Sequence, residues 1–124
     1  MIDTTSFHTQ LLAERARIIT DLEPIARLDE AAGEWTAVPD IEELKESDDN
    51  NEADGIEEWN ERRATVAALD VTFRNITRAL QKISAGTFGI CEIGGEIIEP
   101  ERLAFLPTAR TCTVHMDVEA TLSL

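Results

Sequence analysis

A long helix with an apolar seam is the feature that most limits what this chain can fold into. Over residues 55–85, apolar side chains recur every seven residues in two interleaved series, and Arg62 is the one polar position among them. The series comprise Trp59, Val66, Phe73 and Leu80, and then Leu69, Ile76 and Ile83. This heptad pattern predicts a helix about 45 Å long that packs one face against a partner. Gly86 follows as the expected C-cap.

A second, weaker seam lies near the N-terminus. A helix is expected over residues 4–30, and its apolar positions share one stripe: Leu11, Ile18, Leu22 and Ile25. Arg15 interrupts this stripe, and Pro24 should kink or break the helix. Two seamed helices in one short chain most simply pack on each other as an antiparallel hairpin. The sequence therefore predicts a mainly α fold built on a two-helix coiled-coil hairpin.

The segment between the two helices is acidic. Eleven acidic residues and a single lysine lie between residues 40 and 61, and Gly33 and Pro39 precede them. Crowding of like charges favours an open, solvated connection over residues 31–54. A short helix over residues 41–46 is an alternative for part of it.

Charge limits the partners of the chain. It carries 25 acidic and 11 basic residues in 124, a net charge of -14. Such a surface repels nucleic acid and anionic membranes, so we expect a protein partner and no direct binding of nucleic acid. The sequence has neither a membrane-spanning apolar run nor a signal-peptide pattern, and only two cysteines. We expect a cytoplasmic protein that is a monomer or a weak oligomer.

The C-terminal part of the chain has a different character. Residues 86–115 are rich in glycine, proline and short apolar pairs, which predicts turns and small strands with little core. A segment with so little apolar mass usually needs a staple such as a metal. The expected organisation is a helical hairpin over residues 1–85 with an acidic tip at about 40–58, this small module, and a short terminal helix over residues 116–124.

Four positions of this module have the spacing of a zinc ribbon. Cys91 is followed after two residues by Gly94, and Cys112 is followed after two residues by His115. A zinc ribbon places two ligand pairs on tight turns that are separated by 15 to 20 residues. Cys91, Cys112 and His115 are therefore the candidate metal ligands. Three ligands and a water would match a catalytic zinc in number, but no general base is evident nearby, so we do not expect an enzyme.

The run GTFGICEIGGEIIEPERLAFLPTARTC resembles the C4-type zinc-finger signature of the DksA/TraR family. The signature reads G-x-[YF]-G-x-C-E-x-C-G, followed by an isoleucine, an Arg-Leu pair, a proline and C-x-x-C. The positions shared with it are Gly86, Phe88, Gly89, Cys91, Glu92, Gly95, Ile97, Arg102, Leu103, Pro107, Ala109 and Cys112. The resemblance covers about residues 48–115. It implies that Gly94 replaces the second cysteine of the family and that His115 replaces the fourth.

The resemblance leaves two states of the finger open. Zinc could be held with a fourth ligand from Glu92, Glu96, water or a neighbouring chain. Alternatively, the module could lack a metal and be held by packing of five apolar side chains: Phe88, Ile97, Ile98, Leu103 and Phe105.

The resemblance also implies a function. Proteins of this family regulate transcription by binding RNA polymerase, inserting a coiled-coil hairpin with an acidic tip into the secondary channel. Ungapped counting from Cys91 places the D-x-x-D-x-A tip pattern of the family on Asp48, Asn51 and Ala53, where Asn51 replaces an acid. Further acids keep this tip negative: Asp49, Glu52 and Asp54. The alternative is a diverged structural or interaction hairpin that binds another partner or itself.

Overall fold

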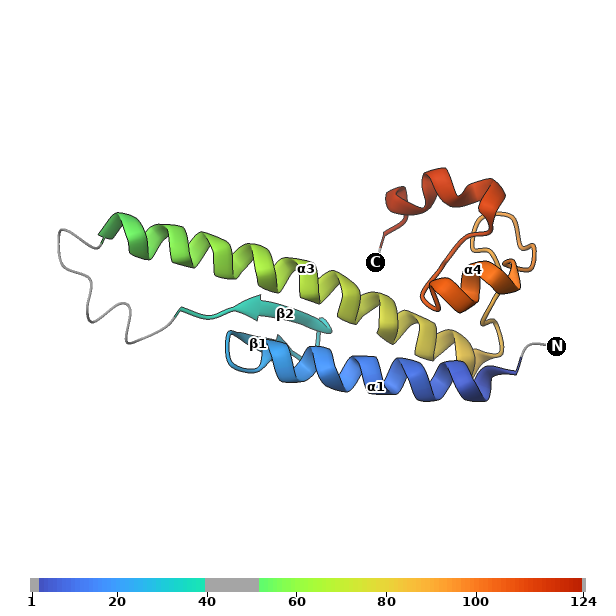
Figure 1. Ribbon diagram of the computed structural model, residues 1–124, viewed down its shortest axis with the longest axis horizontal. Helices are drawn as coiled ribbons and strands as arrows, with labels where there is room; N and C mark the ends of the chain where they lie inside the picture. Colours follow the sequence, from blue (N-terminus) through green and yellow to red (C-terminus); the bar gives the residue numbers. More distant parts are fainter. Residues whose placement is uncertain (1–2, 40–51, 124) are drawn as a thin grey trace. The chain divides into compact units, whose positions relative to one another are not determined.

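The computed structural model describes residues 3–39 and 52–123, without the side chains of residues 52–54. Its elements, in chain order, are α1 (Thr4–Leu22), β1 (Ala26–Asp29), β2 (Glu34–Ala37), α3 (Glu52–Ala85), α4 (Pro100–Phe105) and the 3-10 helix η1 (Thr113–Thr121) (Figure 1). The chain divides into two compact units, residues 1–15 with 75–124 and residues 16–74.

Helix α3 confirms the prediction from the heptad seam and begins three residues before the expected start. At its end the N–H of Thr87 donates to the carbonyl of Lys82 at 2.9 Å, and Gly86 has a φ of 78°, so glycine caps the helix as predicted. The seam residues Val66, Phe73 and Ile76 are buried, and the others are half-buried: Trp59, Leu69, Leu80 and Ile83.

Helix α1 ends at Leu22, two residues before Pro24. The prediction of a helix that continues to residue 30 is therefore wrong. In the first unit the beginning of α1 and the end of α3 run antiparallel (Figure 1). Phe7 packs on Phe88, with ring centroids 5.2 Å apart. The predicted antiparallel helical hairpin is therefore confirmed, but its first helix is shorter than expected.

Residues after Pro24 form a two-stranded ribbon that the sequence analysis did not predict. Strand β1 pairs antiparallel with β2, with Ala26 opposite Ala37 and Asp29 opposite Glu34. The Asp29 carboxylate accepts the N–H of Ala31 at 3.0 Å and so helps to form the turn. The ribbon occupies part of the segment for which an open loop was expected. The alternative short helix over residues 41–46 lies outside the described residues.

The ribbon is fixed to α3 in the second unit through a buried acid. Asp70 is 6% exposed, and its Oδ1 accepts the backbone N–H of Trp35 in β2 at 2.9 Å. The Trp35 ring meets Phe73 edge-on, with centroids 5.9 Å apart. Arg62, the polar position of the seam, donates from Nη1 to the carbonyl of Val38 at 3.1 Å. The polar residues Asp70 and Arg62 of α3 thus bind the backbone of β2 and of the residue that follows it.

The C-terminal module contains more helix and less strand than expected. The predicted small strands are reduced to one bridge between Ile90 and Ile97. Helix α4, which was not predicted, begins at Pro100, a residue that suits the first turn because its missing N–H would be unpaired there. The expected terminal helix is η1, which begins at Thr113, before the predicted start.

The packing proposed for a metal-free module is partly wrong. Phe88, Ile98 and Leu103 are buried, but Ile97 is 67% exposed and Phe105 is 91% exposed. Ile97 precedes Ile98 in extended chain, so the two side chains point in opposite directions. Phe105 lies two residues after Leu103 in α4 and so faces away from it. Two of the five side chains expected to form this core therefore contribute nothing to it.

Replacing Asp70 tests the attachment of the ribbon. Asp70→Ala should lower the free energy of unfolding by about 1–3 kcal/mol, because the buried N–H of Trp35 loses its acceptor. Asp70→Asn keeps an acceptor oxygen and should cost much less. Denaturation followed by tryptophan fluorescence measures both variants. An Asp70→Ala variant as stable as the wild type would contradict this role.

Candidate metal centre

Cys91 lies on a tight turn that brings its sulfur toward the residues that follow. The N–H of Cys91 donates to the carbonyl of Glu96 at 2.7 Å, and the N–H of Gly95 donates back to the carbonyl of Cys91 at 2.9 Å. Gly95 has a φ of 78°, which favours glycine at this point of the turn. This turn buries the Cys91 thiol and returns the chain so that Glu96 lies beside it.

Cys112 and His115 lie on a second turn. Cys112 precedes the first residue of η1, and the N–H of His115 donates to its carbonyl at 3.1 Å. Residues three apart in a 3-10 helix lie on the same side, so this turn brings the two side chains together. Cys112 is buried and the His115 side chain is 27% exposed.

The two turns bring four ligand atoms together, from Cys91, Glu96, Cys112 and His115, all within 4.8 Å of one another. His115 Nδ1 lies 3.4 Å from the sulfur of Cys91, 3.3 Å from that of Cys112 and 3.4 Å from Oε2 of Glu96. The same Oε2 lies 3.4 Å from the sulfur of Cys112. Tetrahedral zinc with ordinary bond lengths separates its ligand atoms by about 3.3–3.7 Å. Four of the six distances between the ligand atoms lie in this range, so the residues present fit zinc.

The two thiols have different acidities. Burial raises the pKa of Cys91, but backbone hydrogen bonds from Gly94, Cys112 and Ile93, with a contribution from His115, lower it to about 7. Burial and the neighbouring Glu96 carboxylate raise the pKa of Cys112. A thiolate is the form that binds zinc, and the lowered pKa of Cys91 favours that form.

Cys91, Cys112 and His115, the ligands predicted from the spacing, thus lie in one cluster. Of the two carboxylates considered as a fourth ligand, Glu96 belongs to it and Glu92 does not. Zinc would join the two turns and so connect the segment after α3 to the start of η1.

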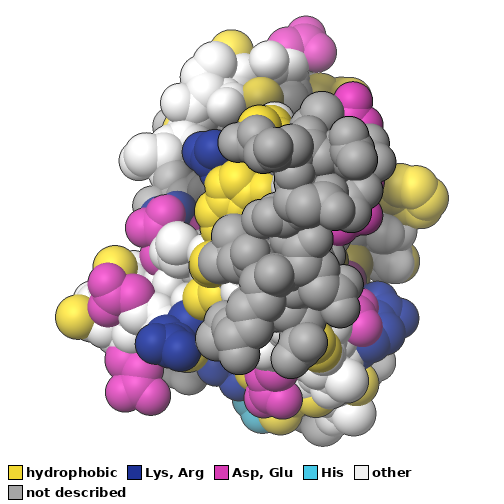
Figure 2. Space-filling model, turned by 90° about the vertical axis from the view of Figure 1, so that its left-hand side faces the viewer, with side chains coloured by type: hydrophobic (Ala, Val, Ile, Leu, Met, Phe, Trp, Pro, Cys, Tyr) yellow, Lys and Arg dark blue, Asp and Glu magenta, His cyan; other side chains and the backbone are white. Residues whose placement is uncertain are grey.

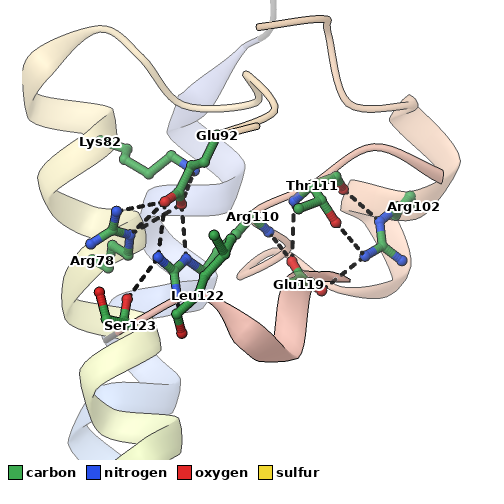
Figure 3. Close-up of polar contacts among 9 residues, drawn as sticks. All are labelled: Arg78, Lys82, Glu92, Arg102, Arg110, Thr111, Glu119, Leu122 and Ser123. Carbon is green, nitrogen blue, oxygen red and sulfur yellow. Dashed lines mark hydrogen bonds and ion pairs between the residues drawn. The ribbon is translucent and has the colours of Figure 1, made fainter. Parts of the chain in front are cut away.

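Glu92 instead binds three cations (Figure 3). Arg110 donates to it from Nε and Nη2 at 3.0 Å each, Arg78 from Nη2 at 2.5 Å, and Lys82 from Nζ at 3.2 Å. Partial burial raises the pKa of Glu92, but these hydrogen bonds outweigh burial and hold its pKa far below the usual range. The network attaches the Cys91 turn to α3 and to the segment that leads to Cys112.

Glu119 makes the corresponding connection on η1 (Figure 3). Its Oε2 accepts Nη2 of Arg102 at 3.0 Å, and its Oε1 accepts the backbone N–H groups of Arg110 and Thr111. Arg102 also donates from Nε to the carbonyl of Thr111 at 2.8 Å. Arg102, a shared position of the family motif, therefore holds η1 and α4 together.

These polar networks were not predicted from the sequence. The available signal was that Arg78 and Lys82 lie four residues apart, hence on one face of α3, in a chain with few basic residues. The partners of these two residues are distant in sequence, so spacing could not identify them. The six residues assigned to the acidic tip are outside the described residues or lack described side chains: Asp48, Asp49, Asn51, Glu52, Ala53 and Asp54.

Removing the Glu92 carboxylate tests the network. Glu92→Ala should cost about 2–4 kcal/mol of stability, because the 8%-exposed side chain of Arg110 and the 15%-exposed side chain of Lys82 would keep their charges without this anionic partner. Glu101→Ala, at an exposed position of α4, is the matched control and should change little. Urea denaturation followed by circular dichroism compares them. Equal stability of the two variants would show that Glu92 does not stabilise the module.

Known proteins resemble parts of the sequence. No protein-family model matches the chain. It is 38% identical over 84 residues to general stress protein 16O of Bacillus subtilis, a match that covers 64% of this chain and 52% of that protein. It is 43% identical over 67 residues to the uncharacterized protein YteA of Bacillus subtilis, covering 51% of this chain and 28% of YteA. The chain thus spans about half or less of the length of these relatives.

Solved structures match most of the chain. One is transcription factor DksA2 from Pseudomonas aeruginosa, with a TM-score of 0.69 and 22% identity over 93% of this chain and 81% of that one. Another is the RNA polymerase binding protein and transcriptional regulator Dks from Chlamydia trachomatis, with a TM-score of 0.53 and 22% identity over 100% of this chain and 99% of that one. The chain therefore has the DksA fold, and at the level of the fold this confirms the resemblance to the DksA/TraR family that its finger motif indicates.

Proposed function

We propose that this protein is a transcription regulator that binds RNA polymerase through the secondary channel. The observation that carries the proposal is the likeness in fold to DksA2 over 93% of the chain. The sequence motif around Cys91 also supports it, because that motif lies outside the helical hairpin.

The proposed contact with the catalytic centre is made by the acidic tip. A carboxylate within a few ångströms of a catalytic Mg²⁺ would perturb it, because salt screens little over such a distance. The tip residues are the six assigned above from the sequence, of which Asp48, Asp49 and Glu52 supply charge close to the family pattern. The C-terminal module, held by zinc, would brace the hairpin on the rim of the channel.

Surface charge supports a protein partner. The chain has a net charge of -14, and on the face shown in Figure 2 the described Lys and Arg side chains are scattered among acidic ones. A nucleic-acid-binding face would gather its basic residues into one stripe or patch. Among the described residues, no helix combines the length and the apolarity needed to span a membrane.

A triple substitution at the tip tests the mechanism. The variant Asp48→Ala, Asp49→Ala, Glu52→Ala should still co-purify with core RNA polymerase but should lose its effect on transcript levels in vitro, because the carboxylates nearest the catalytic centre are gone. The matched control removes three exposed acids outside the tip region, Asp21, Glu30 and Glu61, and should keep the effect.

Three results would contradict the proposal at different levels. An unchanged transcription profile for the tip variant would exclude the tip mechanism. Failure of the wild type to bind core polymerase would exclude the whole function. A stable dimer formed through the helical seams, detected by light scattering, would favour the alternative of an interaction hairpin over insertion into a channel.

A further inference from the structure

The Glu96 carboxylate lies in the space that the absence of a side chain at Gly94 leaves free. A Cβ atom built on Gly94 would overlap the carboxylate of Glu96, lying 2.5 Å from its Cδ. The carboxylate therefore occupies the space that any side chain at position 94 would need. Because position 94 is the corner of the zinc-ribbon frame that has no ligand, the acid fills the place where a ligand is missing.

The backbone does not require glycine at this position. Gly95 has a positive φ, but Gly94 does not, so an ordinary L-residue could adopt the conformation found at 94. The backbone conformation therefore does not explain why glycine occupies position 94. The space that the Glu96 carboxylate needs does explain it.

We propose that Glu96 is the fourth protein ligand of a zinc ion that is also held by Cys91, Cys112 and His115, and that Gly94 leaves the space through which this carboxylate reaches the metal. The ligand set is two sulfurs, one nitrogen and one oxygen, all of which zinc accepts. The inference concerns the metal centre alone and does not depend on polymerase binding.

The four-ligand arrangement makes this a closed, structural site. With every tetrahedral position filled by the protein, no position is left for a reactive water. The two thiols are buried, whereas the Glu96 side chain is 50% exposed and that of His115 is 27% exposed. Solvent and chelators would therefore reach the metal from the side of the carboxylate, its hardest ligand.

Two substitutions test the proposal by different routes. Glu96→Gln replaces the carboxylate ligand with a weak amide and should lower zinc affinity at least about tenfold, measured by competition with a chelator. Gly94→Ala removes no ligand but places a methyl group where the carboxylate lies, and should also lower the affinity. The matched control, Glu101→Gln on the exposed face of α4, should leave the affinity unchanged.

The two effects should not add, because both act through the same carboxylate. In the Glu96→Gln background, Gly94→Ala should therefore cause no further loss of affinity. X-ray absorption of the zinc-loaded wild type should show two sulfur and two nitrogen or oxygen neighbours. In Co²⁺-loaded protein, Glu96→Gln should shift the d–d bands, while charge transfer from the two thiolates should persist.

Two outcomes would overturn the proposal. If Glu96→Gln and Gly94→Ala both bind zinc as tightly as the wild type, with an unchanged cobalt spectrum, the fourth ligand is water or another group. If the wild type binds no zinc, the site is not a metal centre, and the polymerase proposal would still stand on its own test. Circular dichroism of each variant checks that the hairpin remains folded.

Discussion

The ion pairs of the Glu92 carboxylate are the interaction that attaches the C-terminal module to α3. The carboxylate joins three cations, Arg78 and Lys82 from α3 and Arg110 from the segment before η1. Because Ile97 and Phe105 point to solvent, apolar packing in this module is limited to a few side chains. Polar connections therefore supply order that a larger core would supply elsewhere. The metal cluster lies beside this network, with Cys91 adjacent to Glu92 and Cys112 two residues after Arg110.

The helical part of the fold could be predicted because its signal repeats. The seam of α3 contains seven apolar positions in phase, and a helix is the regular structure that places them on one face. The β1–β2 ribbon was missed because its strands are only four residues long, so their alternation of apolar and polar residues is too short to stand out in the sequence. Its stability comes partly from Asp70, which binds the backbone of Trp35 from 35 residues away. A local pattern cannot show a contact of that separation.

The candidate site was predictable in part for the same reason. Cys91, Cys112 and His115 could be proposed from spacing, since each ligand pair lies on a short turn. The position of Glu96 could not, because both Glu92 and Glu96 lie close to Cys91 in sequence. The geometry of the turn, with Gly95 at positive φ, directs Glu96 toward the two thiols, whereas Glu92 binds the Arg and Lys side chains. The tip residues are predicted from sequence alone, and their test is functional.

The central claim is that a metal held by both turns, rather than an apolar core, completes the C-terminal module. The most direct measurement is the zinc content of the protein purified without added metal, by elemental analysis against protein concentration. We expect about one zinc ion per chain, because four converging ligands should retain the metal through purification. A content near zero in protein whose module is folded would contradict it.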